Sequence, residues 1–232
     1  MRSVIRWLAP VTALVMLAAL YLIFMHVETE REMGVVQRIL YVHAPAAWAA
    51  YVCFALVAGG GIAVLRRGSE AGDRLAVAAA EVGVLMCTLN LITGPIWARP
   101  IWGVWWTWDP RLTMTVIMWA IYVGYVMLRA FGREVDAIAN YAAVLGIFGL
   151  LSIPVIRVSV RLLDGMHPAV VTTREGGSGL ADPSMRLTLL VSGIAMLLLA
   201  LWLVALRARL EGLIRTSAAL RRELDYRDGV TV

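Results

Sequence analysis

The chain has 232 residues, of which 61% are hydrophobic and only 16% are charged. A water-soluble domain is about 45–50% apolar and about 25% charged, so the apolar excess excludes an ordinary soluble fold. The net charge is +5 and every basic residue is Arg, but these Arg residues are scattered between apolar runs. The clustered basic face of a nucleic-acid-binding protein is therefore excluded, and the composition predicts an integral membrane protein.

Six apolar runs are each long enough to cross a bilayer, which takes about 20 helical residues. Backbone groups in hydrocarbon pair within their own segment, and the alternating pattern of a membrane β-barrel is missing. The sequence predicts an all-α polytopic membrane protein, with a six-helix transmembrane domain over residues 1–206. The first run has no convincing cleavage site and is expected to remain as a helix. The expected spans are 7–25, 44–65, 75–97, 112–128, 137–156 and 187–206.

The distribution of Arg residues predicts the orientation. If the N-terminus is cytoplasmic, most Arg residues fall in inner segments, as the positive-inside rule requires. Both termini are then cytoplasmic, and residues 207–232 form a basic amphipathic tail. Met33, Val36 and Leu40 recur at helical spacing and indicate a short interfacial helix, while Pro154 is expected to kink the fifth span. The expected outer segments are 27–43, 98–111 and 157–186.

The second outer segment is unusually rich in tryptophan. An interfacial aromatic belt scatters one or two Trp over each helix end, whereas this segment favours a platform for a large, flat, apolar ligand. Arg111 can bind a ligand carboxylate such as a haem propionate, or it can form a salt bridge with Asp109 that holds the loop; the sequence leaves both open. Four of the nine Trp residues fall in this loop: Trp102, Trp105, Trp106 and Trp108.

Two of the three histidines are candidate metal ligands. His43 opens the second span and His167 lies in the third outer segment, so both are expected on the side of the tryptophan loop. Neutral imidazole is a common axial ligand of haem iron. A His pair beside an aromatic platform therefore predicts an iron held by two imidazoles, whereas His26 lacks this context and is interpreted as an interfacial residue.

Other polar residues in the spans have structural alternatives. Glu81 in the third span is a functional candidate, but a structural role is favoured, in which it reaches toward the cytoplasmic headgroups or pairs with a neighbouring helix. Arg157 and Arg161 share a helical face at the outer end of the fifth span, where they meet propionates or lipid phosphate. Cys53 and Cys87 lie in apolar runs without a CxxC motif, which favours small buried hydrophobic side chains over a redox role.

Residues 102–113, WGVWWTWDPRLT, resemble the tryptophan-rich "WWD" signature of haem-handling proteins in cytochrome c maturation. Within that superfamily, the length, the six spans and the single outer His on each side of the signature resemble CcmC, the haem exporter protein C family. Residues 38–47 and 153–167 resemble the two histidine segments of that family. The resemblance covers roughly residues 35–205.

The resemblance implies that b-type haem binds non-covalently at the periplasmic face of a bacterial cytoplasmic membrane, with iron between His43 and His167. It implies delivery to a haem chaperone of the CcmE type, and association with CcmA-, CcmB- and CcmD-like subunits of an ABC complex. The chain has no Gly-rich phosphate loop, so ATP hydrolysis is expected in a partner subunit. The residues expected to hold the macrocycle are Trp102, Trp105, Trp106, Trp108, Asp109 and Arg111.

Two other functions are weighed against haem transfer. No residue set of a hydrolase or oxidoreductase is found, so a haem-transfer protein is expected rather than an enzyme. A holocytochrome c synthase-type haem lyase is the nearest alternative, but such chains are larger, with more spans and more His. A secondary transporter predicts a polar midplane with broken or inverted-repeat helices, and Glu81 and Asn90 supply little such polarity.

Overall fold

A computed structural model describes residues 2–31, 33–132, 137–162, 180 and 182–227. Every regular element in these ranges is helical, and six helical segments are long and apolar enough to cross a membrane. The all-α class and the six spans are therefore confirmed. The helices are α1 (Arg2–Tyr21), η1 (Leu22–His26), η2 (Val35–Ile39), α2 (Leu40–Arg67), α3 (Glu70–Trp102), α4 (Pro110–Phe131), α5 (Ile138–Leu150), α6 (Ser152–Leu162) and α7 (Pro183–Arg227).

Several helices extend well beyond the apolar runs that predicted them. With 33 residues, α3 is about 50 Å long, and the 45 residues of α7 span about 67 Å, against about 30 Å of hydrocarbon. The predicted tail, residues 207–232, begins inside α7 without a break in the helix. The interfacial helix expected near Met33 is the 3₁₀ helix η2, which leads directly into α2.

The fifth span is divided into two helices. Helix α5 ends at Leu150 and α6 begins at Ser152, so the helix is interrupted at Leu151. Pro154 has no backbone N–H to donate to the carbonyl of Leu150. This missing bond is the physical reason for the break, and it confirms the kink expected from the proline.

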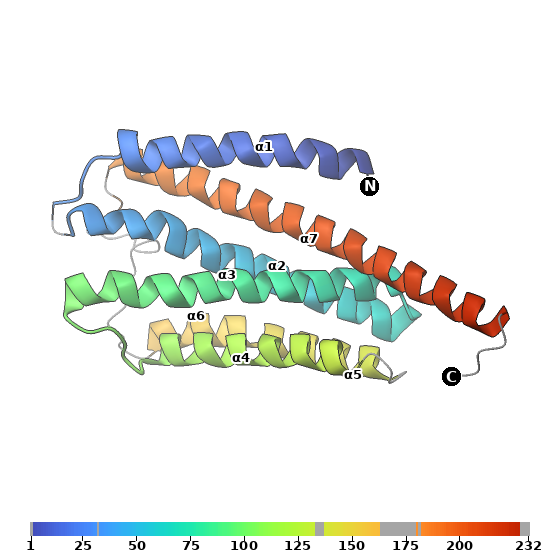
Figure 1. The fold of residues 1–232 in the computed structure, drawn as a ribbon. Coiled ribbons are helices and arrows are strands. Elements are labelled where there is room, and N and C mark those ends of the chain that lie inside the picture. The colour runs from blue at the N-terminus through green and yellow to red at the C-terminus, as the bar shows by residue number, and fades with distance from the viewer. Residues whose placement is uncertain (1, 32, 133–136, 163–179, 181, 228–232) are drawn as a thin grey trace.

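The helices are arranged as a bundle of roughly antiparallel rods (Figure 1). The connections α1–α2 and α3–α4 lie at one end of the bundle, together with the C-terminal end of α6 and the N-terminal end of α7. We call this the loop end. The described chain begins and ends at the opposite end, the terminal end. The three segments predicted on one side of the membrane therefore leave from helices at a common end.

The core is built on close contact between α2 and α3. A Cβ atom at Gly60 would lie 2.5 Å from the carbonyl oxygen of Gly72, so glycine at this position allows the two backbones to touch. Such small residues are typical of helix packing in membranes. Phe54 stacks on Tyr122 of α4 with ring centroids 3.6 Å apart, and the Tyr122 hydroxyl donates to the Gly146 carbonyl at 3.0 Å. Helices α2 and α3 are thus in close backbone contact, and α4 and α5 pack beside them.

Ion pairs join α3, α4 and α7 near the terminal end. Asp73 accepts from Arg129 at 2.6 Å and from Arg215 at 2.7 Å, while Arg207 donates to Glu81 at 2.6 Å. Charges inside a span are expensive unless they are paired. The structural interpretation of Glu81, an ion pair with a neighbouring helix, is confirmed.

Candidate functional site

The tryptophan loop is fixed at both of its ends. Gly103 has a φ of 75° and ends α3 in the left-handed conformation that glycine favours, with its N–H donating to the Arg99 carbonyl at 3.0 Å. Asp109 caps α4, because its carboxylate accepts from the Leu112 N–H at 2.9 Å and Pro110 occupies the first turn. The loop is therefore only residues 103–109, shorter than the predicted 98–111.

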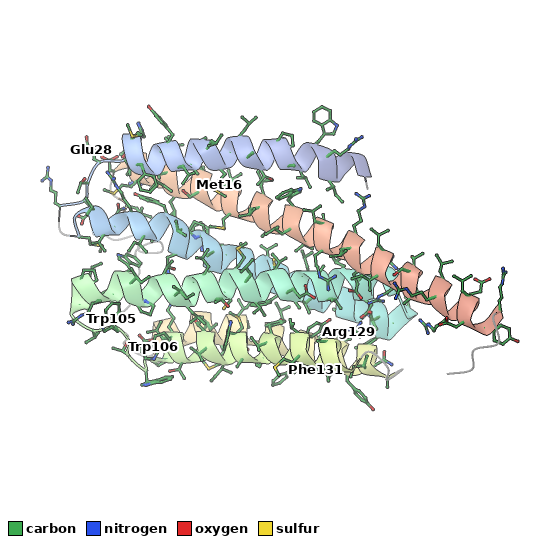
Figure 2. All side chains as sticks on the ribbon, in the orientation of Figure 1. Met16, Glu28, Trp105, Trp106, Arg129 and Phe131 are labelled. Atoms are coloured by element: carbon green, nitrogen blue, oxygen red, sulfur yellow. The ribbon has the colours of Figure 1, made fainter. Side chains whose placement is uncertain are left out.

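The loop presents two of its tryptophans to the surroundings. Trp108 is 75% exposed and Trp105 is 60% exposed. Trp106 packs edge-on against Trp108, with ring centroids 5.6 Å apart and an interplanar angle of 77°. Figure 2 shows Trp105 and Trp106 at the loop end, far from Phe131 at the terminal end. Such exposed indole faces can stack on a flat ligand.

A small crevice separates the loop from α3. Its volume is about 20 Å³, room for little more than one water molecule. A porphyrin cannot enter this crevice. The Trp106 Nε1 is buried and has no hydrogen-bond partner among the described residues, although buried indole N–H groups usually find one. The lining consists of Gly94, Pro95, Ala98, Trp102, Val104, Trp105, Trp106, Thr107 and Leu112.

His43 lies in the first turns of α2 and packs against α3. Its Nδ1 is 3.1 Å from the Thr93 Oγ1. The Asn90 amide donates to the backbone carbonyl of His43 at 3.0 Å and lies 3.2 and 3.3 Å from Nδ1 and Nε2 of the ring. The Trp97 ring centroid is 5.7 Å away. The imidazole is therefore held on several sides by one helix.

The contact with Thr93 is compatible with a His43 tautomer that carries its proton on Nδ1, while the Asn90 amide nitrogen lies at nearly equal distances from both ring nitrogens. The Thr93 hydroxyl has a single proton, which it donates to the Leu89 carbonyl at 2.8 Å, so its oxygen is available to accept from Nδ1–H. A proton on Nδ1 leaves the lone pair of Nε2 for a metal, the usual second-sphere arrangement of a ligating histidine. The Asn90 amide, 3.3 Å from Nε2, must release that atom before a metal can bind it.

A chain of rings connects His43 to the tryptophan loop. Trp97 lies between His43 and Trp102, with centroids 5.7 and 6.3 Å from them. Gly94 lines the crevice, and a Cβ atom there would lie 3.3 Å from the His43 Cε1. Sequence reasoning did not assign Asn90, Thr93 or Trp97 to the site. The available signal was their spacing, which places positions 90, 93, 94 and 97 on one face of α3.

The remaining predicted site residues differ in how they are placed. The Asp109 carboxylate caps α4 and accepts from the Thr107 hydroxyl at 3.2 Å. Arg111 lies partly buried in the first turn of α4. His26 is exposed at the end of η1. His167 lies outside the described residues, as do the side chains of Arg157 and Arg161.

The fold defines the chain as a multi-pass helical membrane protein. At one end of its helical bundle it presents an aromatic surface, formed by the capped tryptophan loop, and a histidine held by the neighbouring helix. The family model described as CcmC, Heme exporter protein C, matches residues 1–223. This match covers nearly the whole chain, and the chain belongs to that family.

Known proteins named for this family are similar over most of their length. A "Heme exporter protein C" of Bradyrhizobium diazoefficiens is 33% identical over 206 residues, 88% of this chain and 78% of that protein. The Escherichia coli K12 protein of the same name is 30% identical over 207 residues, 88% of this chain and 82% of the relative. A ccmC-like mitochondrial protein of Marchantia polymorpha, whose name refers to cytochrome c biosynthesis, is 32% identical over 160 residues, covering 69% and 68%.

Proposed function

We propose that this chain binds haem as cargo at its loop end and passes it on during the maturation of c-type cytochromes. The names of the family and of its relatives support haem handling in this process. The observation that carries the proposal is the position of His43. Its ring is oriented by Thr93 and connected through Trp97 to the base of the tryptophan loop.

The described residues fit a porphyrin that lies on the surface of the protein. His43 supplies one imidazole to the iron through Nε2, and His167 is the proposed second ligand. Trp105 and Trp108 offer the exposed faces for the macrocycle, and Arg111 is the proposed partner of a propionate. Asp109 contributes by holding the loop on α4. Haem iron would act as a Lewis acid that accepts the lone pairs of the two imidazoles. With both imidazoles bound, the iron would have no open position for oxygen.

An open site suits a protein that must release its ligand. Small-molecule pockets that retain a ligand bury about 70–90% of its surface, whereas the crevice beside this loop has only about 20 Å³. A haem on the outer face of the loop remains accessible to a second protein. The proposed recipient is a periplasmic haem chaperone of the CcmE type, and the proposed assembly includes CcmA-, CcmB- and CcmD-like subunits of an ABC complex.

The proposed orientation places the loop end on the periplasmic side of a bacterial cytoplasmic membrane. Most Arg residues then lie at or beyond the terminal end, which accords with the positive-inside rule. The Arg-containing extension of α7 belongs to the same side. A cysteine introduced at the exposed Trp108 and reacted with a membrane-impermeant thiol reagent in intact cells tests this orientation.

The haem site is tested by absorption spectroscopy of the purified protein. Oxidised and reduced wild-type protein is expected to show the signal of low-spin haem with two imidazole ligands. His43→Ala and His167→Ala should each lose this signal, while His26→Ala should keep it. Unchanged spectra in the first two variants would refute the ligand assignment. Covalent attachment of haem to an apocytochrome by the chain alone would instead favour a holocytochrome c synthase-type lyase.

A further inference from the structure

A large cavity lies at the terminal end, away from the tryptophan loop. It has a volume of about 840 Å³ between α3, α4, α5 and α7. Its walls combine apolar side chains with several arginines and carboxylates. Figure 2 shows Arg129, one of its lining residues, near the terminal end of α4, at the opposite end of the bundle from Trp105 and Trp106. The cavity is separate from the proposed haem site, and the ion pairs in its walls do not fill it.

Arg129 contributes hydrogen-bond donors that the described part of the chain does not use. Its side chain is 12% exposed, and its Nη2 donates to Asp73 at 2.6 Å. Its Nε and Nη1 are buried and have no hydrogen-bond partner within the described residues. Buried donors on a charged group are costly to leave unpaired, so each such group requires an explanation, such as a bound anion.

Among the described residues, the charges around the cavity leave one arginine in excess. Each described carboxylate of the set is already paired, since Glu70 binds Arg74 and the others bind Arg129, Arg207 or Arg215. Arg222 lines the cavity and contacts a backbone carbonyl at 3.4 Å. Five arginines thus face four carboxylates among the described lining residues and their partners: Arg74, Arg129, Arg207, Arg215, Arg222, Glu70, Asp73, Glu81 and Glu211.

We propose that this cavity binds a singly charged phosphate group between Arg129 and Arg222. The second N–H of the Arg129 Nη2, together with one of the two unused donors, forms a planar fork that matches a pair of phosphate oxygens. One negative charge also balances the excess arginine.

The membrane supplies such a group at this level of the protein. The apolar spans end at this part of the bundle, where phospholipid headgroups lie, and basic pockets between transmembrane helices bind anionic headgroups. Apolar lining residues such as Val77, Val126 and Ile214 can contact the adjoining glycerol and acyl carbons. The same phosphate chemistry is also available from solution, so the two sources must be separated experimentally.

The test uses the full chain, purified in a neutral detergent and stripped of lipid. Three probes are titrated separately: phosphatidylglycerol, phosphatidylcholine and inorganic phosphate. Bound phospholipid is counted by native mass spectrometry, and thermal unfolding reports all three. Arg129→Lys keeps the charge but replaces the planar guanidinium fork by a compact ammonium group. Arg222→Gln removes the excess charge, and its matched control is Arg221→Gln, an exposed neighbour that does not line the cavity.

Phosphatidylglycerol is expected to bind about tenfold more tightly than phosphatidylcholine. Arg129→Lys and Arg222→Gln should each weaken its binding about tenfold, while Arg221→Gln should leave it unchanged. A stabilisation by inorganic phosphate alone that is lost in Arg129→Lys and Arg222→Gln would support the site with a soluble ligand. Equal binding of every probe by the wild type and these two variants would overturn the proposal. If Arg129→Lys fails to fold, the comparison of Arg222→Gln with Arg221→Gln decides the outcome.

Discussion

Replacing Thr93 by Val isolates the contact that orients the proposed iron ligand. The Thr93 oxygen lies 3.1 Å from the His43 Nδ1 and is positioned to accept its proton. Valine has nearly the same shape but no acceptor, so the helix packing is retained while the Nδ1–H loses its partner. The imidazole is then free to rotate or to change tautomer. We expect Thr93→Val to retain the fold and to bind haem less tightly.

The size of this effect follows from the position of Thr93 as the hydrogen-bond partner of the proposed iron ligand. Loss of such a partner typically costs 10–100-fold in metal affinity, which corresponds to about 1.4–2.7 kcal/mol. Thr93→Ser keeps the hydroxyl and should restore most of the affinity. Titration of the purified variants with haem, followed by absorbance, measures both values.

A matched control removes a similar hydroxyl elsewhere. The Thr188 hydroxyl donates to the Ser184 carbonyl four residues earlier at 2.7 Å, as the Thr93 hydroxyl does to Leu89 at 2.8 Å. Thr188→Val is expected to bind haem like the wild type. If Thr93→Val also binds like the wild type, or if Thr93→Ser is as weak as Thr93→Val, the proposed orientation of His43 through this hydroxyl is wrong.

Two further predictions concern the loop itself. Trp108→Ala should lower haem affinity several-fold, since an aromatic pair contributes about 0.5–1.5 kcal/mol beyond its buried area. Phe131→Ala, which removes another highly exposed aromatic ring at the terminal end, serves as the control in the same haem titration. Asp109→Ala should lower the free energy of unfolding by about 1 kcal/mol through loss of the cap on α4, and Asp109→Asn, which keeps an acceptor, should not. An equal loss in both Asp109 variants would indicate that the negative charge matters rather than the cap.

The spans could be predicted from the sequence, but the ends of the helices could not. Hydropathy marks the part of a helix that lies in hydrocarbon, whereas the helix ends where its backbone bonds end. The third apolar run stops near residue 97, yet α3 continues to Trp102 because Gly103 provides the left-handed residue that ends it. The tryptophan loop is shorter than predicted for this reason. Helix α7 likewise continues far beyond its apolar run.

The candidate site was visible in the sequence only where its residues are neighbours in the chain. The Trp residues of the loop are close together in sequence and were found. The contacts of His43 with Asn90 and Thr93 bridge 47 and 50 residues, and they depend on how α2 is aligned with α3, which a hydropathy pattern does not report. The role of Asp109 was left open, although an Asp followed by Pro is a helix N-terminus signal that predicts the observed cap.

The two halves of the proposed haem site differ in rigidity, and this difference bears on transfer. His43 and Thr93 lie on α2 and α3, which are in close contact beside them, since a Cβ atom at Gly94 would lie 3.3 Å from the His43 Cε1. The aromatic side of the site is a seven-residue loop held by its two helix caps, with large exposed indoles. An imidazole already held on a helix reduces the entropic cost of holding iron, while an open aromatic face leaves the porphyrin within reach of an acceptor. A carrier needs both properties, because a fully enclosing pocket would have to open before each transfer.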